Sequence, residues 1–164
     1  TQLLTLLQPD PDHRLLDVGG GTGRVTSELV EHVAQVCIVD LSPGMLFQAR
    51  EKGLCAYQGV AERLPFQDGT FDRILIVDAF HHFRDWPEAA AELVRVLRPG
   101  GRMVVEEPDI RNKAVKLIAL GEWLLLMRSR FFAPNDLARF FQVAGGRATR
   151  LEEHNGIYWV VIER

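Results

Sequence analysis

Hydrophobic and polar positions along this chain follow two different periods, one typical of strands and the other typical of helices. Short apolar runs, each bounded by turn residues, predict five strands at residues 14–18, 35–39, 54–58, 71–77 and 102–106. In the fourth of these runs, residues 74–77 read Ile-Leu-Ile-Val without alternation. A run of this kind is typical of a parallel strand that helices cover on both faces.

Helical periodicity fills the segments between the predicted strands. We expect helices at residues 3–7, 24–33, 43–52, 86–97, 113–130 and 134–144. The third of them begins with Ser42 as its N-cap and Pro43 at its first position, and Gly53 follows its end. The fourth is followed by Pro-Gly-Gly at residues 99–101, which leads into the fifth strand.

The end of the chain has a different pattern. Asn155 and Gly156 lie between two strand-like runs, and this dipeptide favours the type I′ turn of an antiparallel hairpin. Together with the alternation of strands and helices, it predicts a doubly wound α/β fold with five parallel strands, an antiparallel C-terminal pair at one edge, and helices on both faces. The sequence contains no internal repeat or linker, so we expect residues 1–164 to form one domain.

Net charge, cysteine positions and the length of apolar runs indicate which partners and which cell compartment to expect. The net charge of -3 gives no sign of the strongly basic face that nucleic-acid binding usually requires. Cys37 and Cys55 form no CxxC motif and lie in apolar stretches, as expected of reduced core cysteines in a cytosolic protein. The longest apolar run is shorter than the ~20 residues that span a bilayer, and no signal peptide opens the chain. We therefore expect a cytoplasmic protein with neither a nucleic-acid partner nor a membrane span.

The most informative stretch is LLDVGGGTGRV at residues 15–25. A strand, a glycine turn and a helix in this order direct backbone N–H groups at a ligand above the carboxyl end of the strand. A dinucleotide usually requires GxGxxG, but the third glycine of that motif would fall at Arg24. Asp17 would repel a pyrophosphate, whereas it would suit an ammonium group. We therefore expect a nucleoside with a positively charged tail, and a nicotinamide-dependent oxidoreductase is the less favoured alternative.

Asp40 ends the second predicted strand, which lies next to the first strand in sheets of this kind. A carboxylate at this place can accept hydrogen bonds from both hydroxyls of a ribose. Capping the following helix is the competing role, but Ser42 already serves as that cap. We therefore expect Asp40 to bind the ribose.

Five blocks of the sequence carry a resemblance to a known family. LLDVGGGTG, IVDLSPGML, VAERLPFQDGTFD, ILIVDAFHHF and LRPGGRMVV, in this order and at these separations, resemble the class I S-adenosylmethionine-dependent methyltransferases. The similarity is greatest to the small-molecule group that includes the ubiquinone and menaquinone biosynthesis methyltransferases, and it covers about residues 14–108. The resemblance implies a Rossmann-like seven-stranded fold. It also implies methyl transfer from S-adenosyl-L-methionine to a small-molecule acceptor, with S-adenosyl-L-homocysteine as the product.

The resemblance also assigns roles to individual positions. It implies that Gly19, Gly21 and Gly23 pack under the methionine part of the cofactor, with Asp17 near its amino group. It implies that Asp40 holds the ribose, that Leu41 and Met45 pack on the adenine, that Ala61 offers its N–H to the adenine, and that Val77 offers its carbonyl to the ammonium.

One position departs from the family's pattern. Where this chain has Val60, members of the family usually have an aspartate that accepts a hydrogen bond from the adenine amino group. Either Glu62 accepts that hydrogen bond, or packing and backbone contacts alone hold the adenine. The alternative role for Glu62 is that of a solvated loop carboxylate.

The reaction sets few demands on catalytic side chains. Methyl transfer from a sulfonium is an in-line displacement, so the protein chiefly aligns donor and acceptor and excludes water. A general base is needed only if the acceptor must lose a proton. We predict His81 and His82 as the catalytic residues, with Glu106 and Glu107 as further candidates, although one of the two histidines is expected to bond backbone carbonyls instead. No helical HxxxH and no close Cys/His spacing points to a metal ion.

The segment at residues 113–132 follows the fifth strand, where members of the family often cover the acceptor pocket. We expect Trp123, Met127, Phe131 and Phe132 to form an apolar wall suited to an aromatic or aliphatic acceptor. A buried core helix and a dimer surface are the alternatives, because apolar residues spread widely around this helix.

Only 13 residues precede the first predicted strand, whereas relatives usually carry a longer N-terminal part. This length is expected of a minimal enzyme with an open site, or of a site that a partner protein or a second subunit completes. The alternative function is a module that binds S-adenosylmethionine without catalysis and acts as a partner or sensor.

Overall fold

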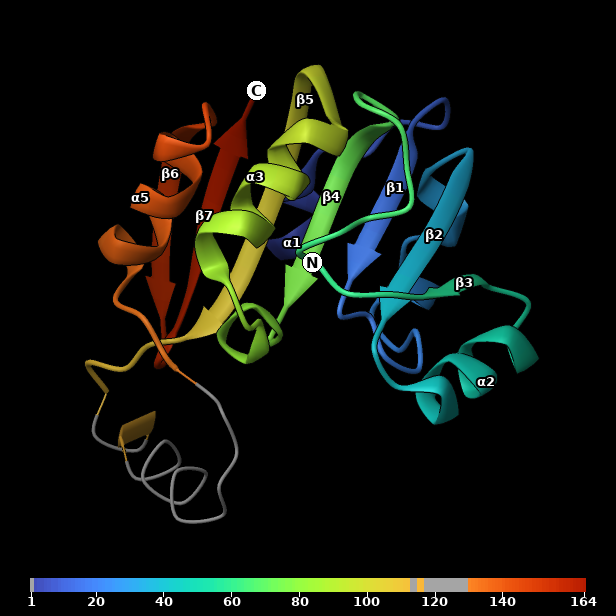
Figure 1. Cartoon of the computed structure of the whole chain (residues 1–164), viewed down its shortest axis with the longest axis horizontal. Helices are drawn as coiled ribbons and strands as arrows, with labels where there is room; N and C mark the ends of the chain where they lie inside the picture. The colour runs from blue at the N-terminus through green and yellow to red at the C-terminus, as the bar shows by residue number, and fades with distance from the viewer. Residues whose placement is uncertain (1, 113–114, 117–129) are drawn as a thin grey trace.

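A seven-stranded sheet forms the centre of the molecule (Figure 1). The computed structural model describes residues 2–112, 115–116 and 130–164. The strands lie in the order β3-β2-β1-β4-β5-β7-β6. Their bounds are β1 Arg14–Val18, β2 Gln35–Asp40, β3 Cys55–Gln58, β4 Phe71–Val77, β5 Leu97–Pro108, β6 Arg147–His154 and β7 Ile157–Glu163.

The sheet is parallel except at one edge. Strands β1 to β5 are mutually parallel, and β7 lies antiparallel between β5 and β6. The turn between β6 and β7 has positive φ angles at both of its central residues, 50° at Asn155 and 82° at Gly156, as a type I′ turn requires. The predicted fold, with its antiparallel C-terminal hairpin, is confirmed. All the parallel strands end at the lower edge of the sheet in Figure 1.

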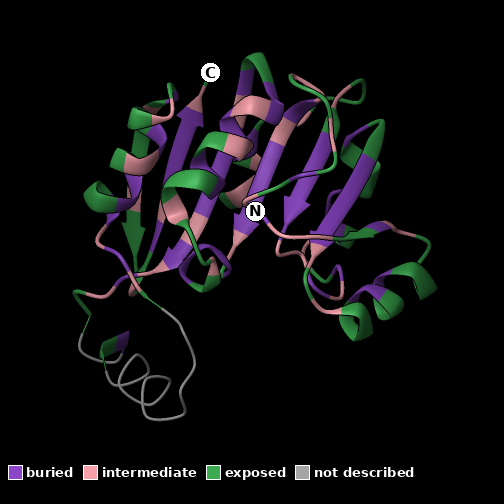
Figure 2. Ribbon diagram, viewed as in Figure 1, coloured by how far each residue is buried: buried purple, intermediate pink, exposed green. Residues whose placement is uncertain are grey.

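Helices cover both faces of the sheet. The α-helices are α1 Gln2–Leu7, α2 Pro43–Glu51, α3 Trp86–Val96 and α5 Pro134–Val143. Helices α3 and α5 lie in front of the sheet and α1 lies behind it (Figure 1). The front core contains Leu93 and Phe141 from these helices, and the rear core contains Leu6 and Leu7. The central strands are buried along most of their length, whereas β6 is largely exposed (Figure 2).

The prediction of an α-helix at residues 24–33 is wrong. This segment forms two short 3₁₀ helices, η1 Thr26–Glu28 and η2 Val30–His32. The Thr26 hydroxyl donates a hydrogen bond to the Asp17 carboxylate on the sheet, and the Ser27 hydroxyl donates to the Gly23 carbonyl at 2.6 Å. These side-chain bonds compete with regular helical bonds. No α-helix N-terminus therefore follows the glycine turn to bind an anion.

The other helix termini agree with the sequence. Ser42 caps α2, where its hydroxyl accepts a hydrogen bond from the Met45 N–H at 3.4 Å, and Asp85 caps α3 by accepting from the Glu88 N–H at 3.0 Å. Almost all of the helix predicted at residues 113–130 lies outside the described residues. In the part of the chain that the structure describes, no helix has the length and apolar character needed to cross a membrane.

Candidate active site

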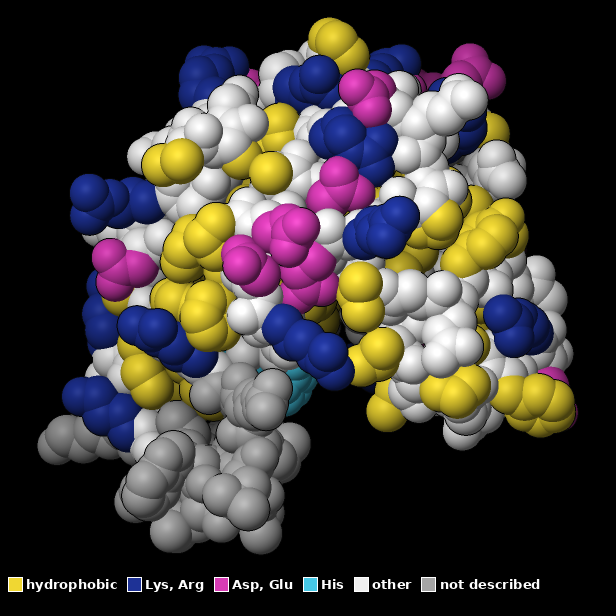
Figure 3. All heavy atoms as spheres, in the orientation of Figure 1, with side chains coloured by type: hydrophobic (Ala, Val, Ile, Leu, Met, Phe, Trp, Pro, Cys, Tyr) yellow, Lys and Arg dark blue, Asp and Glu magenta, His cyan; other side chains and the backbone are white. Residues whose placement is uncertain are grey.

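A cavity of about 500 Å³ opens at the edge of the sheet where the parallel strands end. In the space-filling view a hollow is visible there, bordered by hydrophobic side chains on one side and by a basic side chain on the other (Figure 3). Residues that follow β1, β2, β3 and β4 line this cavity, and most of them are apolar. A position at the carboxyl ends of parallel strands is where open α/β sheets bind their ligands.

The glycine turn after β1 brings bare backbone to this cavity at Gly19. Its φ is 78°, and a Cβ added there would lie 2.4 Å from the Cβ of Ala79, so no other residue fits. Gly19 lines the cavity as predicted. Gly23 has a different role: an added Cβ would lie 2.3 Å from Leu54 in the protein interior. Neither Gly23 nor Gly21 lines this cavity, and neither lines the smaller cavity that Gly19 also borders.

A second, smaller cavity of about 180 Å³ adjoins the first, and both are lined by Gly19 and Asp78. Asp17 and Val77 also line it. Asp17 is only 2% exposed, and burial raises the pKa of its carboxyl to about 6. The negative charge of Asp40 acts in the same direction, and the hydrogen bond from Thr26 opposes it. A buried carboxylate of this kind favours a cation beside it.

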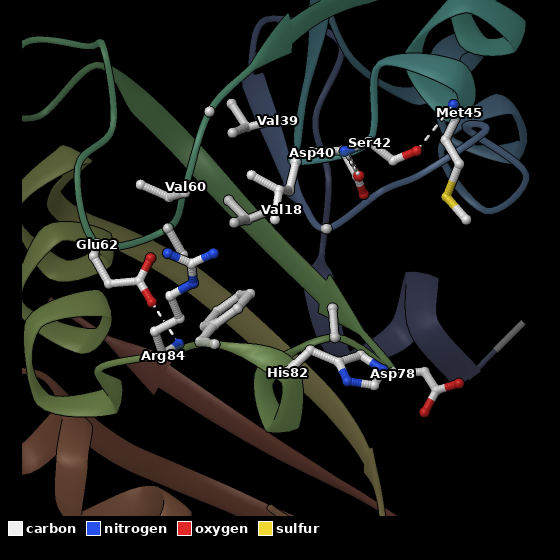
Figure 4. A pocket seen from close by; sticks show the side chains of 16 residues that line it. Val18, Val39, Asp40, Ser42, Met45, Val60, Glu62, Asp78, His82 and Arg84 are labelled. Carbon is white, nitrogen blue, oxygen red and sulfur yellow. Dashed lines mark hydrogen bonds between the residues drawn. The ribbon is translucent and has the colours of Figure 1, made fainter. Parts of the chain in front are cut away.

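Asp40 is held at the wall of the larger cavity by two backbone donors. One carboxylate oxygen accepts a hydrogen bond from the Gly21 N–H at 3.0 Å, and the other accepts from the Ser42 N–H at 2.8 Å. Figure 4 shows this carboxylate beside Ser42. Because Ser42 itself caps α2, Asp40 is not the helix cap that competed with the ribose role. Its carboxylate joins the glycine turn to the start of α2.

Apolar side chains form two opposite sides of the larger cavity. Leu41 and Met45 line one side and are 55% and 47% exposed. Val60 and the buried Ala61 line the other, on the loop that follows β3. Large apolar side chains that remain exposed at a cavity mouth favour an apolar group of a ligand.

Glu62 lies on the same loop, is half-buried, and has one of its two carboxylate oxygens bonded within the protein. Its Oε1 accepts hydrogen bonds from the N–H groups of Arg84 at 2.7 Å and Asp85 at 3.2 Å. Glu62 therefore fastens the loop after β3 to the loop before α3 (Figure 4). Arg84 also lines the cavity, although the sequence analysis did not single it out. Its place two residues after His82 was the available signal.

The two histidines after β4 have different surroundings. His82 is exposed and lines the larger cavity. His81 is 2% exposed and does not line that cavity; its Nδ1 lies 2.6 Å from the carboxylate of Glu107. The other Glu107 oxygen accepts hydrogen bonds from the N–H groups of Ala79 at 3.0 Å and Phe80 at 2.6 Å. Glu107 therefore holds the loop that carries both histidines.

Other candidates from the sequence lie outside the cavity. Glu106 accepts a hydrogen bond from the Trp159 indole N–H at 2.6 Å. Phe131 stacks on the His81 ring at 4.3 Å, and Phe132 packs into the front core, so neither lines the cavity. Trp123 and Met127, the rest of the predicted apolar wall, lie outside the described residues. Among the described residues, no group of three or more His, Cys, Asp or Glu could hold a metal ion.

Asp78 marks the junction of the two cavities by its backbone. Its φ is 52°, an uncommon left-handed conformation for a residue with a side chain. Its N–H donates to the Glu106 carbonyl at 2.9 Å, which holds this conformation in place. Strained backbone of this kind tends to cluster at functional sites.

Known proteins that are similar in sequence to this chain are named as methyltransferases. The methyltransferase domain family matches residues 16–105, which is more than half of the chain. The demethylmenaquinone methyltransferase of Mycobacterium marinum is 40% identical over 119 residues, which cover 73% of this chain and 52% of that protein. The chain thus spans about half the length of the curated relatives it matches.

Solved structures of other proteins share this fold. The YcgJ protein from Bacillus subtilis superposes with a TM-score of 0.80 at 26% identity, covering 93% of this chain and 69% of that one. The [4+2]-cyclase SpnF superposes with a TM-score of 0.78 at 25% identity, covering 92% of this chain and 57% of that one. From the glycine turn, the strand order and the family match over residues 16–105, this chain belongs to the methyltransferase domain family.

Proposed function

We propose that this chain binds S-adenosylmethionine in its two adjoining cavities and transfers the methyl group to a small-molecule acceptor. The observation that carries the proposal is that the two cavities lie side by side and share two lining residues, Gly19 and Asp78. The smaller cavity contains a buried carboxylate, Asp17, and the larger one contains Asp40. A nucleoside with a cationic tail matches this order of groups.

The residues present fit such a ligand in size and charge. The larger cavity, at about 500 Å³, is within the usual range for small-molecule sites. An ammonium group in the smaller cavity would offset the cost of ionising Asp17, whose carboxyl is buried. The carboxylate of Asp40 has acceptor capacity for hydroxyl groups beyond its two backbone donors. Leu41 and Met45 offer apolar surface to a base.

When bound, S-adenosylmethionine supplies an activated methyl group that an in-line displacement moves to the acceptor. This chain's residues act on position and solvation. The bare backbone at Gly19 lets the ligand approach the sheet, Asp40 orients the ribose, and Leu41 and Met45 exclude water from the base. Fixed orientation of this kind accounts for a large part of the barrier reduction in such transfers.

We assign the role of proton acceptor to His82 when the acceptor must lose a proton. Its imidazole lies at the wall of the larger cavity (Figure 4). His81, the other predicted catalytic residue, is buried against Glu107 and in this proposal positions the loop. His82, which is exposed, thus acts on the acceptor, and His81, which is buried, holds in place the loop that carries His82.

The acceptor that we propose is aromatic or apolar. Ala79 and Phe83, which lie close to His82 in the sequence and are not assigned to the base, also line the larger cavity, and an apolar acceptor lying against them loses little hydration. The relative from Mycobacterium marinum is named for demethylmenaquinone, a compound of this class. A soluble naphthoquinol is therefore the first acceptor to test.

Calorimetric titration tests the binding part of the proposal. We expect S-adenosylhomocysteine to bind with a stoichiometry of one and NADH to give no binding heat. Transfer of a labelled methyl group to a naphthoquinol tests the reaction. Binding of NADH alone would contradict the proposal and favour the nicotinamide-dependent alternative.

One second function has a specific observation in its favour. The likeness to a [4+2]-cyclase means that this fold carries reactions other than methyl transfer. A chain that binds the nucleoside without transferring its methyl group would bind S-adenosylhomocysteine yet methylate none of a panel of quinols, phenols and amines. That pair of results would favour a binding module, or an enzyme of another reaction, over a methyltransferase.

A further inference from the structure

The order of the two carboxylates along the cavities indicates where the nucleobase of the proposed ligand would lie. In the proposed function Asp17 faces the cationic tail and Asp40 faces the ribose. The base then lies beyond Asp40, between Leu41 and Met45 on one side and residues 59–62 on the other. The polar groups at this end therefore decide which base the site prefers.

This end of the cavity offers few side-chain acceptors. Gly59, Val60 and Ala61 have no polar side-chain atom. Glu62 is the carboxylate of this loop; its Oε1 is already bonded to the N–H groups of Arg84 and Asp85, which leaves Oε2 as its one acceptor oxygen without a bond to a described residue. The exocyclic amino group of adenine is a donor and needs an acceptor oxygen. Among the described residues, the side chains of residues 59–62 supply a single such oxygen, Glu62 Oε2.

Arg84 provides donors at the same end. Its backbone N–H is fixed by Glu62, and its side chain lines the cavity. Figure 4 shows the guanidinium extending toward the part of the cavity that Val60 lines. The guanidinium makes no hydrogen bond or ion pair with another described residue, unlike that of Arg95, which is bonded to Glu92 and Asp68. Its five N–H donors are therefore available to a ligand.

An arginine distinguishes purines by the acceptors on their edge. A 6-oxopurine presents two neighbouring acceptors, O6 and N7, which match the two-donor fork of a guanidinium, whereas adenine presents one acceptor and one donor there. We propose that Arg84 reads the purine edge through its acceptors, so that this site binds 6-oxopurine nucleosides as well as adenine nucleosides. The inference rests on the proposed function, because it uses the placement of the nucleoside in the larger cavity.

Two homocysteine nucleosides test this directly, with calorimetry on the full chain. S-inosyl-L-homocysteine and S-adenosyl-L-homocysteine differ at the purine edge, and we expect their dissociation constants to agree within about threefold. Arg84→Ala should weaken the inosyl compound about fivefold or more and the adenosyl compound about twofold or less. Arg63→Ala is the matched control, because Arg63 is an exposed arginine nearby that does not line the cavity. It should change neither constant.

A gain of selectivity is the complementary test. Val60→Asp adds a carboxylate acceptor at the base end, so it should raise the ratio of inosyl to adenosyl dissociation constants about tenfold. If Val60→Asp does not fold, as judged by its melting curve, Val60→Asn adds an acceptor oxygen without charge and should change the ratio in the same direction.

Three results would overturn a proposal, and they can be told apart. If the inosyl compound binds the unaltered protein about twentyfold or more weakly than the adenosyl compound, the site selects adenine and the inference fails. If Arg84→Ala weakens both compounds equally, Arg84 does not read the base and the inference also fails. If neither compound binds, the proposed function itself fails.

Discussion

Two buried carboxylates lie at the same edge of the sheet, and their surroundings differ. Asp17 on β1 and Glu107 on β5 are both 2% exposed. Glu107 accepts two backbone N–H bonds and has His81 Nδ1 at 2.6 Å, so both of its oxygens are bonded within the protein. Asp17 accepts a hydrogen bond from Thr26 and lines the smaller cavity.

The difference indicates how to tell a structural polar group from a binding one. A buried carboxylate whose two oxygens are compensated stabilises the segment it bonds, here the loop at residues 79–81. At Asp17, burial outweighs the single hydrogen bond and the pKa rises to about 6, so ionisation remains costly until a cation arrives. Burial alone does not separate the two roles, but the completeness of hydrogen bonding does.

Of the substitutions that test this difference, Glu107→Ala is expected to have the largest effect, and the effect is on stability. The substitution leaves two backbone N–H groups and the His81 ring without their acceptor, so we expect a loss of about 3 kcal/mol in the free energy of unfolding. In a chain of 164 residues this lowers the melting temperature by roughly 6–12 °C. Urea denaturation measures the loss.

Glu107→Gln serves as the control for this prediction. It keeps one acceptor oxygen and the side-chain volume, so it should lose less stability than the alanine variant. In both variants the folded protein should bind S-adenosylhomocysteine with an affinity within about threefold of the unaltered chain. A selective loss of binding without loss of stability would mean that Glu107, like Asp17, faces the ligand.

The adjacent histidines sharpen the same contrast at neighbouring positions. His82→Ala removes the proposed proton acceptor, so we expect a fall of about 100-fold in the rate of methyl transfer to a quinol, with a change in stability within about 0.5 kcal/mol. His81→Ala should instead cost about 2 kcal/mol of stability, because it leaves the Glu107 carboxylate short of one partner. Methyl-transfer kinetics and denaturation curves together test the pair. A stability loss in the His82 variant alone would reverse the assignment.

Local patterns in the sequence predicted the features that depend on neighbouring residues. The strands follow from short apolar runs, and the hairpin follows from Asn155 and Gly156, whose positive φ angles are a property of the turn itself. Placing Gly19 and Asp40 at the cavity was also possible from sequence, because the strand ends determine where both residues lie. Each of these predictions needed only the order of residues within one or two elements.

Contacts between distant segments account for what the sequence did not predict. The segment after the glycine turn is not an α-helix, since Thr26 bonds the Asp17 side chain on the sheet. The structural role of Glu107 depends on His81, which is 26 residues away. Gly23 is required by Leu54, which packs against it from beyond α2. No periodicity or motif in the sequence carries these pairings.

A smaller effect is expected at the ribose position. Asp40→Ala removes the proposed acceptor of the ribose hydroxyls, so we expect the dissociation constant of S-adenosylhomocysteine to rise at least about tenfold, or 1.4 kcal/mol. Asp40→Asn is the control, since its amide oxygen can replace one acceptor and should recover part of the affinity. Calorimetry at constant pH measures both. An unchanged constant in the alanine variant would remove Asp40 from the ribose site.

The smallest expected effect is that of Asp17 on ligand affinity, and it appears only when the pH is changed. The carboxyl of Asp17 has a pKa of about 6 in the folded chain, raised by burial from an ordinary value of 3.8. An ammonium group beside it favours the ionised form, so protonation below about pH 6 should weaken the ligand. Between pH 7 and pH 5 we expect the dissociation constant of S-adenosylhomocysteine to rise by up to about tenfold.

Asp17→Asn separates this effect from other groups that titrate in the same range. The variant cannot ionise at this position, so its binding should be weaker at pH 7 and nearly independent of pH down to pH 5. Without ligand the sign reverses: between pH 3.8 and about 6 the folded chain holds a proton that the unfolded chain has lost. Stability should therefore rise as the pH falls from 7 to 5 in the unaltered chain, and this increment should be absent in Asp17→Asn. Opposite slopes for binding and stability, both removed by one substitution, would identify Asp17 as the carboxylate that faces the cation of the ligand.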